Sequence, residues 1–233
     1  MLLSFLFAAI VVLFLPTRAW QRYRKKTPPT PPTRYIAETA TLIALLSFLL
    51  WRNDISFRTL GLSGHPPVRW FADAATCLLV IVGADFFMYG KTVRQLRSGA
   101  TLSDLKGLAA DALSAQSLGL EFLFVTIIGA VWEELCFRGT VFALVPHTSV
   151  WMLSALIASS LLFGAQHLRN GMHGMVYSTL FGLVFASLFL ITGNLWAVML
   201  AHAVGNLLAA WQWAPRIERA RKQSISRALG FLG

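Results

Sequence analysis

Long apolar runs, separated by short polar or basic segments, make up most of the chain. Seven of them approach or reach the length of a bilayer crossing, which takes about 20 apolar residues in a helix. These runs are Leu2–Leu15, Ile36–Trp51, Trp70–Tyr89, Leu118–Val145, Val150–His167, Met175–Thr192 and Leu195–Trp213. Tryptophans lie at the ends of most runs, as in aromatic belts, and none of the nine prolines lies inside a run. The pattern predicts an all-α polytopic membrane protein with about seven transmembrane helices.

Two segments between the runs differ from them. Residues 27–34 read TPPTPPTR, and we expect an extended, fairly stiff linker there because proline fixes φ and lacks an N–H. Residues 91–117 place Leu and Ala at roughly helical spacing, which is typical of an interfacial amphipathic helix and leaves room for an eighth membrane-embedded element. We therefore divide the chain into amino-terminal spans (1–117), a helical core (118–213) and a basic tail (214–233).

Composition excludes a water-soluble enzyme and indicates how the charges are used. Hydrophobic residues make up 56% of the chain, charged residues 13%, and the mean hydropathy is +0.63. The net charge of +10 could indicate nucleic acid, but the basic residues lie between and after apolar runs, so we interpret them as topology signals and expect no nucleic-acid partner. Cys77 and Cys136 lie inside apolar runs and form no disulfide framework or CxxC motif.

The distribution of Lys and Arg predicts an orientation. Sixteen of the 20 fall in residues 18–34, 91–117, 168–174 and the tail after Trp213. Because cytoplasmic loops carry an excess of positive charge, these segments are expected to face the cytoplasm. The amino terminus is then outside and the carboxyl terminus cytoplasmic.

The fourth run contains three charged residues near its middle: Glu133, Glu134 and Arg138. Each charge costs about 3 kcal/mol at the centre of a span, so the three must face a protein interior or a wet cavity. Glu134 and Arg138 are four residues apart and can pair on one helix face. Glu133 then points about 100° away without a local counter-ion, as a candidate base, acid or metal ligand. The plain alternative is structural glue between helices.

Two other runs supply further polar side chains. His167 ends the fifth run, and His202 and Asn206 share a helix face in the seventh. A lone histidine near a helix end is more often an interfacial or hydrogen-bonded residue than a catalyst. Together with Glu133, however, these residues bring Glu, His, His and Asn from three spans, which favours a buried polar active site. Cys136 is expected to be a buried, inert thiol.

The strings EELCFRG (133–139), FGAQH (163–167) and HAVGN (202–206) resemble the motifs EExxxR, FxxxH and HxxxN of one family. They are the motifs of the type II CAAX prenyl endopeptidases, whose bacterial members are called CPBP or Abi-family intramembrane proteases. The likeness covers roughly 118–213. It implies a multi-pass protease, expected in the bacterial inner membrane, that cleaves a membrane-associated peptide or protein, lipidated substrates included. CAAX-type processing, peptide maturation and bacteriocin self-immunity all remain open as its role.

Carried over residue by residue, the resemblance also implies roles in the site. Glu133 and His167 would activate a water molecule for attack on a peptide carbonyl, and His202 with Asn206 would stabilise the oxyanion. Hydrolysis needs such a set, with a base near the water and donors aimed at the developing charge. Three further residues would support the site: Glu134, Arg138 and Phe163.

The same residues leave the cofactor open. Glu133, His167 and His202 could form a three-ligand zinc site with one open position, but the HExxH spacing of zincins is absent. The family has been described both as metalloproteases and as metal-independent glutamate proteases, and we expect no obligatory metal. Two other functions also fit buried Glu and His side chains. One is a non-catalytic immunity or scaffold protein, and the other is a transporter or proton relay.

Overall fold

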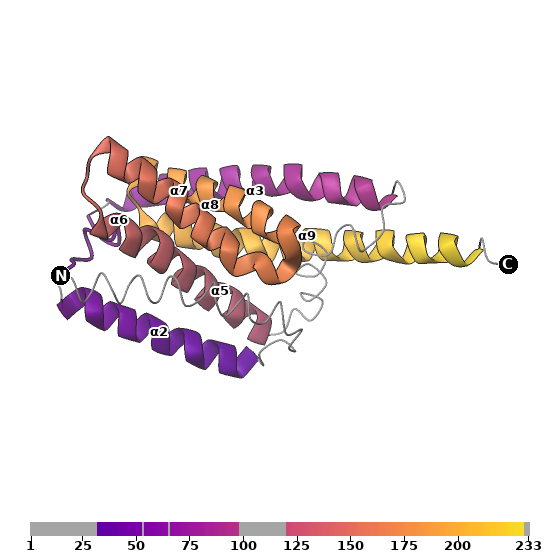
Figure 1. The fold of residues 1–233 in the computed structure, drawn as a ribbon, viewed down its shortest axis with the longest axis horizontal. Coiled ribbons are helices and arrows are strands. Elements are labelled where there is room, and N and C mark those ends of the chain that lie inside the picture. Colours follow the sequence, from indigo (N-terminus) through magenta and orange to yellow (C-terminus); the bar gives the residue numbers. More distant parts are fainter. Residues whose placement is uncertain (1–31, 53, 65, 98–119, 231–233) are drawn as a thin grey trace.

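The protein is described by a computed structural model over residues 32–52, 54–64, 66–97 and 120–230 (Figure 1). Seven α-helices occur there: α2 (Pro32–Arg52), α3 (Pro67–Arg97), α5 (Leu120–Glu134), α6 (Val141–Leu144), α7 (Ser149–Gln166), α8 (Gly171–Thr192) and α9 (Leu195–Gly230). A π-helix, η1 (Leu135–Thr140), and a 3-10 helix, η2 (His167–Asn170), complete the set. These ranges contain no strand, so the all-α prediction is confirmed for them.

Four helices are long and apolar enough to cross a membrane: Val68–Phe87, Ser149–Gln166, Gly174–Thr192 and Leu195–Gln212. They correspond to the third, fifth, sixth and seventh predicted runs. The second run gives only a shorter apolar helix, and the fourth is divided between α5, η1 and α6. The run Leu2–Leu15 lies outside the described residues. Four membrane-crossing helices are therefore supported, and the predicted number of seven to eight is not confirmed.

Helices extend further than the apolar pattern indicated. α2 begins at Pro32, inside the predicted linker 27–34, because proline suits the first turn of a helix. α3 runs to Arg97, into the predicted connector 91–117, whose remainder lies outside the described residues. α9 continues from the predicted core into the predicted basic tail 214–233 and ends at Gly230. A helix can leave the bilayer without ending, so hydropathy alone does not mark its boundary.

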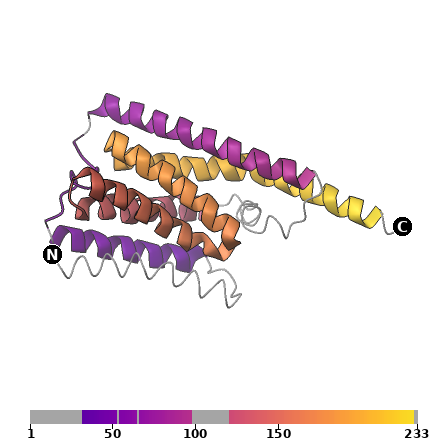
Figure 2. The same cartoon turned by 45° about the horizontal axis from the view of Figure 1, so that its top comes forward.

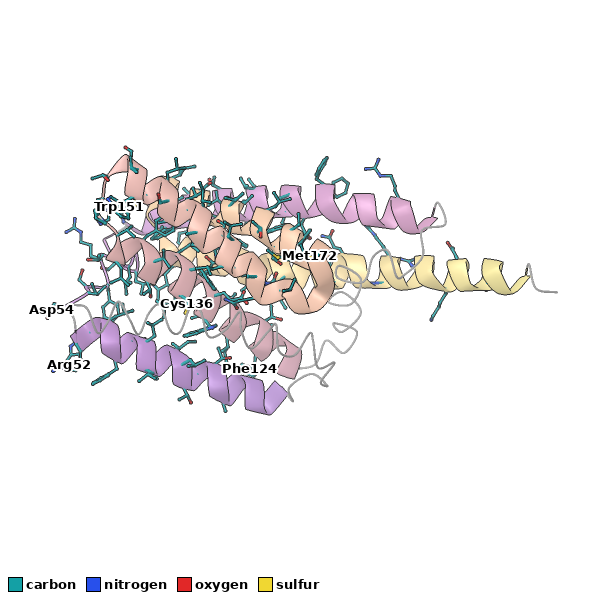
Figure 3. All side chains as sticks on the ribbon, in the orientation of Figure 1. Arg52, Asp54, Phe124, Cys136, Trp151 and Met172 are labelled. Atoms are coloured by element: carbon teal, nitrogen blue, oxygen red, sulfur yellow. The ribbon has the colours of Figure 1, made fainter. Side chains whose placement is uncertain are left out.

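The helices run roughly lengthwise and pack in pairs (Figures 1 and 2). α3 lies along α9, α7 along α8, and α2 along α5. Apolar side chains such as Phe124, Trp151 and Met172 are exposed on the outside, whereas Cys136 is buried (Figure 3). An apolar exterior is what a lipid environment requires, and it agrees with an integral membrane protein.

Small residues bring α7 and α8 into close contact. A Cβ atom at Gly182 would lie 3.0 Å from the Cα of Ser160, and one at Gly164 would collide with the Thr179 side chain. Glycines at such positions let helix backbones approach within a membrane. The α7–α8 pair is therefore packed backbone against backbone.

The segment between α2 and α3 fixes the start of α9. The Leu195 N–H donates to the Gly61 carbonyl oxygen at 2.9 Å, and the Trp196 indole N–H donates to the Leu62 carbonyl oxygen at 3.0 Å. Gly61 has φ +73, and a Cβ there would lie 2.6 Å from the Gly193 carbonyl oxygen. Only glycine fits such a conformation at such a close approach.

Asn194 completes this junction from inside. Its side chain is fully buried, accepts a hydrogen bond from the Ala197 N–H at 3.2 Å, and donates one to the Asp73 carboxylate at 3.2 Å. The first contact caps α9, and the second ties α9 to α3. We call Gly61, Asn194 and Leu195, with these partners, the α9 junction. It sets the position of every residue that α9 carries further along.

Candidate active site

The site begins where α5 changes into the π-helix η1. All six residues of η1 are buried, and the Thr140 hydroxyl donates to the Leu135 carbonyl oxygen at 2.9 Å. Such π segments are rare and occur frequently at functional sites. A Cβ at Gly139 would lie 2.9 Å from the Leu195 side chain, so this segment packs closely against the start of α9. The predicted fourth run gave no sign of this change of helix type.

Glu134 and Arg138 form the buried ion pair that their four-residue spacing predicts. Arg138 Nη1 donates to Glu134 Oε1 at 3.0 Å, and both side chains have no exposed surface. Arg138 Nη2 donates to the Gly182 carbonyl oxygen at 3.0 Å. The guanidinium carbon lies 4.7 Å from the ring centre of Phe163 and 5.4 Å from that of Phe185. Hydrogen bonds and cation–π contacts thus replace the water that burial removes.

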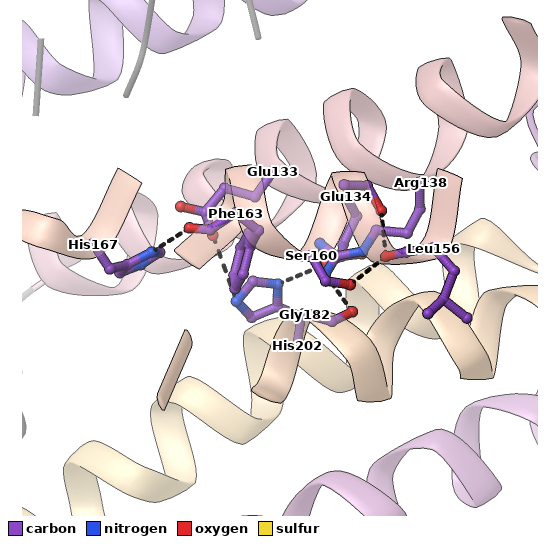
Figure 4. A network of polar contacts seen from close by, with 10 residues as sticks. Glu133, Glu134, Arg138, Leu156, Ser160, Phe163, His167, Gly182 and His202 are labelled. Carbon is purple, nitrogen blue, oxygen red and sulfur yellow. Dashed lines mark hydrogen bonds and ion pairs between the residues drawn. The ribbon is translucent and has the colours of Figure 1, made fainter. Parts of the chain in front are cut away.

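His202 lies between the two glutamates (Figure 4). Its Nδ1 donates to Glu134 Oε1 at 2.7 Å, and its Nε2 lies 3.6 Å from Glu133 Oε2. An ionised carboxylate only accepts hydrogen bonds, so the contact with Glu134 places a hydrogen on Nδ1 and leaves Nε2 facing Glu133. The ring stacks on Phe185 with centroids 4.5 Å apart. His202 is thereby held in position from two sides.

Glu133 is the accessible carboxylate of the pair. Its side chain is 17% exposed, whereas that of Glu134 is fully buried. The sequence indicated that Glu133 points away from the Glu134–Arg138 face and lacks a counter-ion on its own helix. Its ionisable neighbour is instead His202, 69 positions along the chain. A carboxylate that contacts both a fixed imidazole and the outside is well placed to meet a water molecule and a substrate.

His167 approaches the same region from the end of α7. Its Nδ1 donates to the Phe163 carbonyl oxygen at 3.0 Å, because a carbonyl only accepts, and its Nε2 is left available. The Phe163 ring lies 5.0 Å from the His167 ring and 6.0 Å from the His202 ring, between the two (Figure 4). The structure thus brings Glu133, His167 and His202 around Phe163.

Asn206 lies one turn beyond His202 on α9 and is exposed. Among the described residues, no hydrogen bond joins its side chain to Glu133, His167 or His202. Its role in stabilising an oxyanion therefore stays a prediction. The neighbouring Gly205 has a clear packing function, since a Cβ there would lie 2.6 Å from the Ile81 side chain on α3.

The described residues contain no assembled set of metal ligands. Within the described part of the chain, no three side chains of His, Cys, Asp or Glu are grouped so that they could hold a metal ion. This applies to Glu133, His167 and His202, of which His202 and Glu133 meet directly. Cys136 is buried as expected.

Two residues that contact Arg138 and His202 lie on α8, although α8 contains none of the three motifs. Gly182 offers its carbonyl to Arg138, and Phe185 stacks on His202 and lies over the guanidinium. α8 is apolar on all sides, so the sequence contains no periodic signal that would pick out either residue. The glycine inside an apolar helix was the one available hint of close packing.

Comparison with known families supports one of the open interpretations. Residues 115–208 match the family model described as Type II CAAX prenyl endopeptidase Rce1-like. This match confirms the family resemblance. The Rce1-like segment contains all three motifs, from Glu133 to Asn206, and its family implies peptidase activity. No curated protein and no solved structure matches the chain.

Proposed function

We propose that the protein is an intramembrane endopeptidase that hydrolyses a peptide bond with a water molecule activated at Glu133. The Rce1-like match and the four apolar helices support a membrane-embedded peptidase. One observation carries the assignment of the site. The partly exposed Glu133 carboxylate faces Nε2 of a buried His202, whose other nitrogen is held by Glu134.

In the proposed reaction, Glu133 takes a proton from water as the water oxygen attacks the peptide carbonyl carbon. His167 Nε2 is the second acceptor that can orient this water. Collapse of the tetrahedral intermediate breaks the C–N bond, and Glu133 returns the proton to the leaving amine. A base within reach of the water and a largely dry surrounding are the requirements for this step.

The oxyanion is assigned to His202 and Asn206. His202 donates to it only when both ring nitrogens carry hydrogen, and the Glu134 carboxylate beside Nδ1 balances the resulting positive charge. Arg138 in turn keeps Glu134 in place. Glu134, Arg138 and Phe163 are therefore positioning residues, which shape the site without touching the substrate.

The substrate class follows from where the site lies. A peptide or protein associated with the membrane, lipidated or not, is the substrate we propose. CAAX-type processing, peptide maturation and bacteriocin self-immunity all use such substrates. We also propose a bacterial inner-membrane location with the carboxyl terminus in the cytoplasm, on the distribution of Lys and Arg.

The test is product formation by purified protein and its Glu133→Gln variant. Both are reconstituted with membrane peptides, with and without a chelator, and new peptide termini are identified by mass spectrometry. Gln keeps the size of the side chain and removes the base, so we expect product formation to fall by about 100-fold or more. Asp54→Asn is the matched control, because it removes one exposed carboxylate outside the site at a φ of 57, which Asn accepts.

Three results would contradict the proposal. Equal product from the native and Glu133→Gln proteins would remove the base from the mechanism. Substrate-dependent flux in liposomes without any peptide product would favour a transporter. An immunity phenotype that survives Glu133→Gln at normal membrane abundance would favour a non-catalytic binding protein.

A further inference from the structure

Two parallel helices extend past the rest of the molecule on one side. α3 and α9 lie side by side up to the end of α3, and α9 continues further (Figures 1 and 2). We call residues 91–97 of α3 and 213–230 of α9 the basic projection. It is distinct from the apolar part of α9, Leu195–Gln212, which carries His202.

The basic projection has a strongly one-sided charge. It holds eight basic residues: Lys91, Arg94, Arg97, Arg216, Arg219, Arg221, Lys222 and Arg227. Its one acidic residue is Glu218. Arg94 and Arg219 are both exposed, and each uses Nε to donate to a carbonyl oxygen of its own helix, at 3.3 Å and 3.2 Å. Each guanidinium thereby keeps its terminal amino groups for an anionic ligand.

An upright helix would bring only the first of these charges to the lipid headgroups. A helix rises 1.5 Å per residue, so Arg216 lies about 6 Å beyond Gln212, and Arg227 about 22 Å beyond it. The interfacial layer of one leaflet is only about 5–7 Å thick. α9 continues as a helix through Pro215 to Gly230, so it is about 54 Å long, longer than the roughly 40–45 Å of a whole bilayer. An α9 that crosses the bilayer upright therefore carries its positions from Arg219 onward past the headgroups and into water.

We propose that the basic projection binds an acidic, water-exposed peptide segment of the substrate that the Glu133 site cleaves. This inference rests on the proposed peptidase function. Carboxylates on the substrate complement the surplus of Lys and Arg, and such complementarity speeds encounter and selects partners. α9 carries both His202 and most of the basic projection. A substrate segment bound at the projection is therefore oriented towards His202.

The length of α9 sets the position of the acidic segment. Arg216 lies about 21 Å along the helix from His202, and Arg227 about 38 Å. An extended chain covers about 3.3 Å per residue. The acidic residues are therefore expected about 6 to 11 positions from the cleaved bond, on the side of the membrane to which α9 projects.

Binding is measured on the full chain carrying Glu133→Gln, in nanodiscs of zwitterionic lipid, so that turnover does not interfere. The probe is a fluorescent 12-residue oligoglutamate, followed by anisotropy. Arg94→Gln with Arg219→Gln is expected to weaken binding about fivefold, and higher salt to weaken it further. Arg52→Gln with Arg58→Gln is the matched control, since both arginines are exposed, one at the end of α2 and one in the segment that follows it, away from the projection.

Several results would overturn the inference. These are no oligoglutamate binding in zwitterionic nanodiscs, or the same loss in both double variants. Tighter binding of a 12-nucleotide RNA than of the peptide would assign the surface to nucleic acid. Membrane attachment that depends on anionic lipid, with no binding of the peptide, would assign it to headgroups.

A cleavage assay distinguishes failure of this inference from failure of the proposed function. A substrate with acidic residues 6 to 11 positions from the scissile bond is compared with one carrying Gln there, and the acidic form is expected to have the higher kcat/KM. If no peptide is cleaved while oligoglutamate binds as predicted, the peptidase proposal fails and the surface stands. If both substrates are cleaved equally and both double variants bind oligoglutamate alike, the surface fails and the peptidase proposal stands.

Discussion

Glu134, Arg138 and His202, here called the Glu134 cluster, and the α9 junction both bury polar groups, but they do so differently. At the junction, the buried groups are neutral: Leu195 donates to the Gly61 carbonyl, and the Asn194 amide caps α9 and donates to the carboxylate of Asp73, which is partly exposed. In the cluster, full charges are buried, and Glu134 Oε2 and Arg138 Nε have no hydrogen-bond partner in the described part of the chain. The junction is satisfied and serves stability. The cluster keeps buried polar atoms without hydrogen-bond partners, and such exceptions are typical of functional sites.

Arg138→Met should give the largest loss of stability. It removes the cation that balances a fully buried Glu134, and breaking a buried pair typically costs about 3–5 kcal/mol. Thermal unfolding in detergent measures the effect. Arg94→Met, on the exposed end of α3, is the control and should change the midpoint little. Similar midpoints for the two variants would show that the Arg138 contacts contribute nothing beyond packing.

Glu134→Gln should reduce the rate more than it reduces substrate binding. The amide keeps the shape, but it no longer balances a positive charge on His202 when the oxyanion forms. We expect kcat to fall about 100-fold with KM little changed, which is about 2.7 kcal/mol of transition-state stabilisation. Steady-state kinetics on a cleaved peptide gives both values. A rise in KM at constant kcat would assign Glu134 to substrate binding instead.

Gly61→Ala tests whether the junction positions the cluster. The new Cβ would lie 2.6 Å from the Gly193 carbonyl oxygen at φ +73, so we expect a loss of about 2 kcal/mol and lower activity through a displaced His202. Gly64→Ala is the control, with a positive φ of +95 but nearest contacts at 3.6 Å. The idea fails if Gly61→Ala loses stability while kcat stays unchanged.

Asn194→Ala should have the smallest effect of the four. It removes the cap of α9 and one hydrogen bond to Asp73, for which we expect about 1 kcal/mol. Unfolding by heat, compared with Asn194→Asp, separates the two contacts, because Asp keeps the cap but sets a second carboxylate beside Asp73. Equal stability of Asn194→Ala and the native protein would mean that the Gly61–Leu195 contact alone holds the junction.

The sequence predicted those parts of the molecule whose cause is local. The long apolar runs gave four membrane-crossing helices, and the spacing of Glu134 and Arg138 gave their ion pair. The contact of His202 with Glu134 joins residues 68 positions apart, and no periodicity reports such a pairing. The roles of Glu133, His167, His202 and Asn206 came from the motif resemblance, and their part in catalysis is still a prediction.

Other features were missed for reasons that can be stated. The π-helix after Glu134 has no simple signature in residue types. It packs against the start of α9, and a contact between residues so far apart leaves no local pattern in the sequence. The length of α9 was underestimated, since apolar content marks the bilayer and not the end of a helix.

The close approach of α7 and α8 has a consequence for how a substrate enters from the bilayer. At Gly164 and Gly182 the two helices meet so closely that no space is left between them for another chain. α8 touches α3 and α9 only sparsely by comparison. Under the proposed function, a polypeptide would enter beside the α7–α8 pair and not between its two helices. A crosslink from α8 to α3 is then expected to lower cleavage, whereas one from α7 to α8 is expected to leave it unchanged.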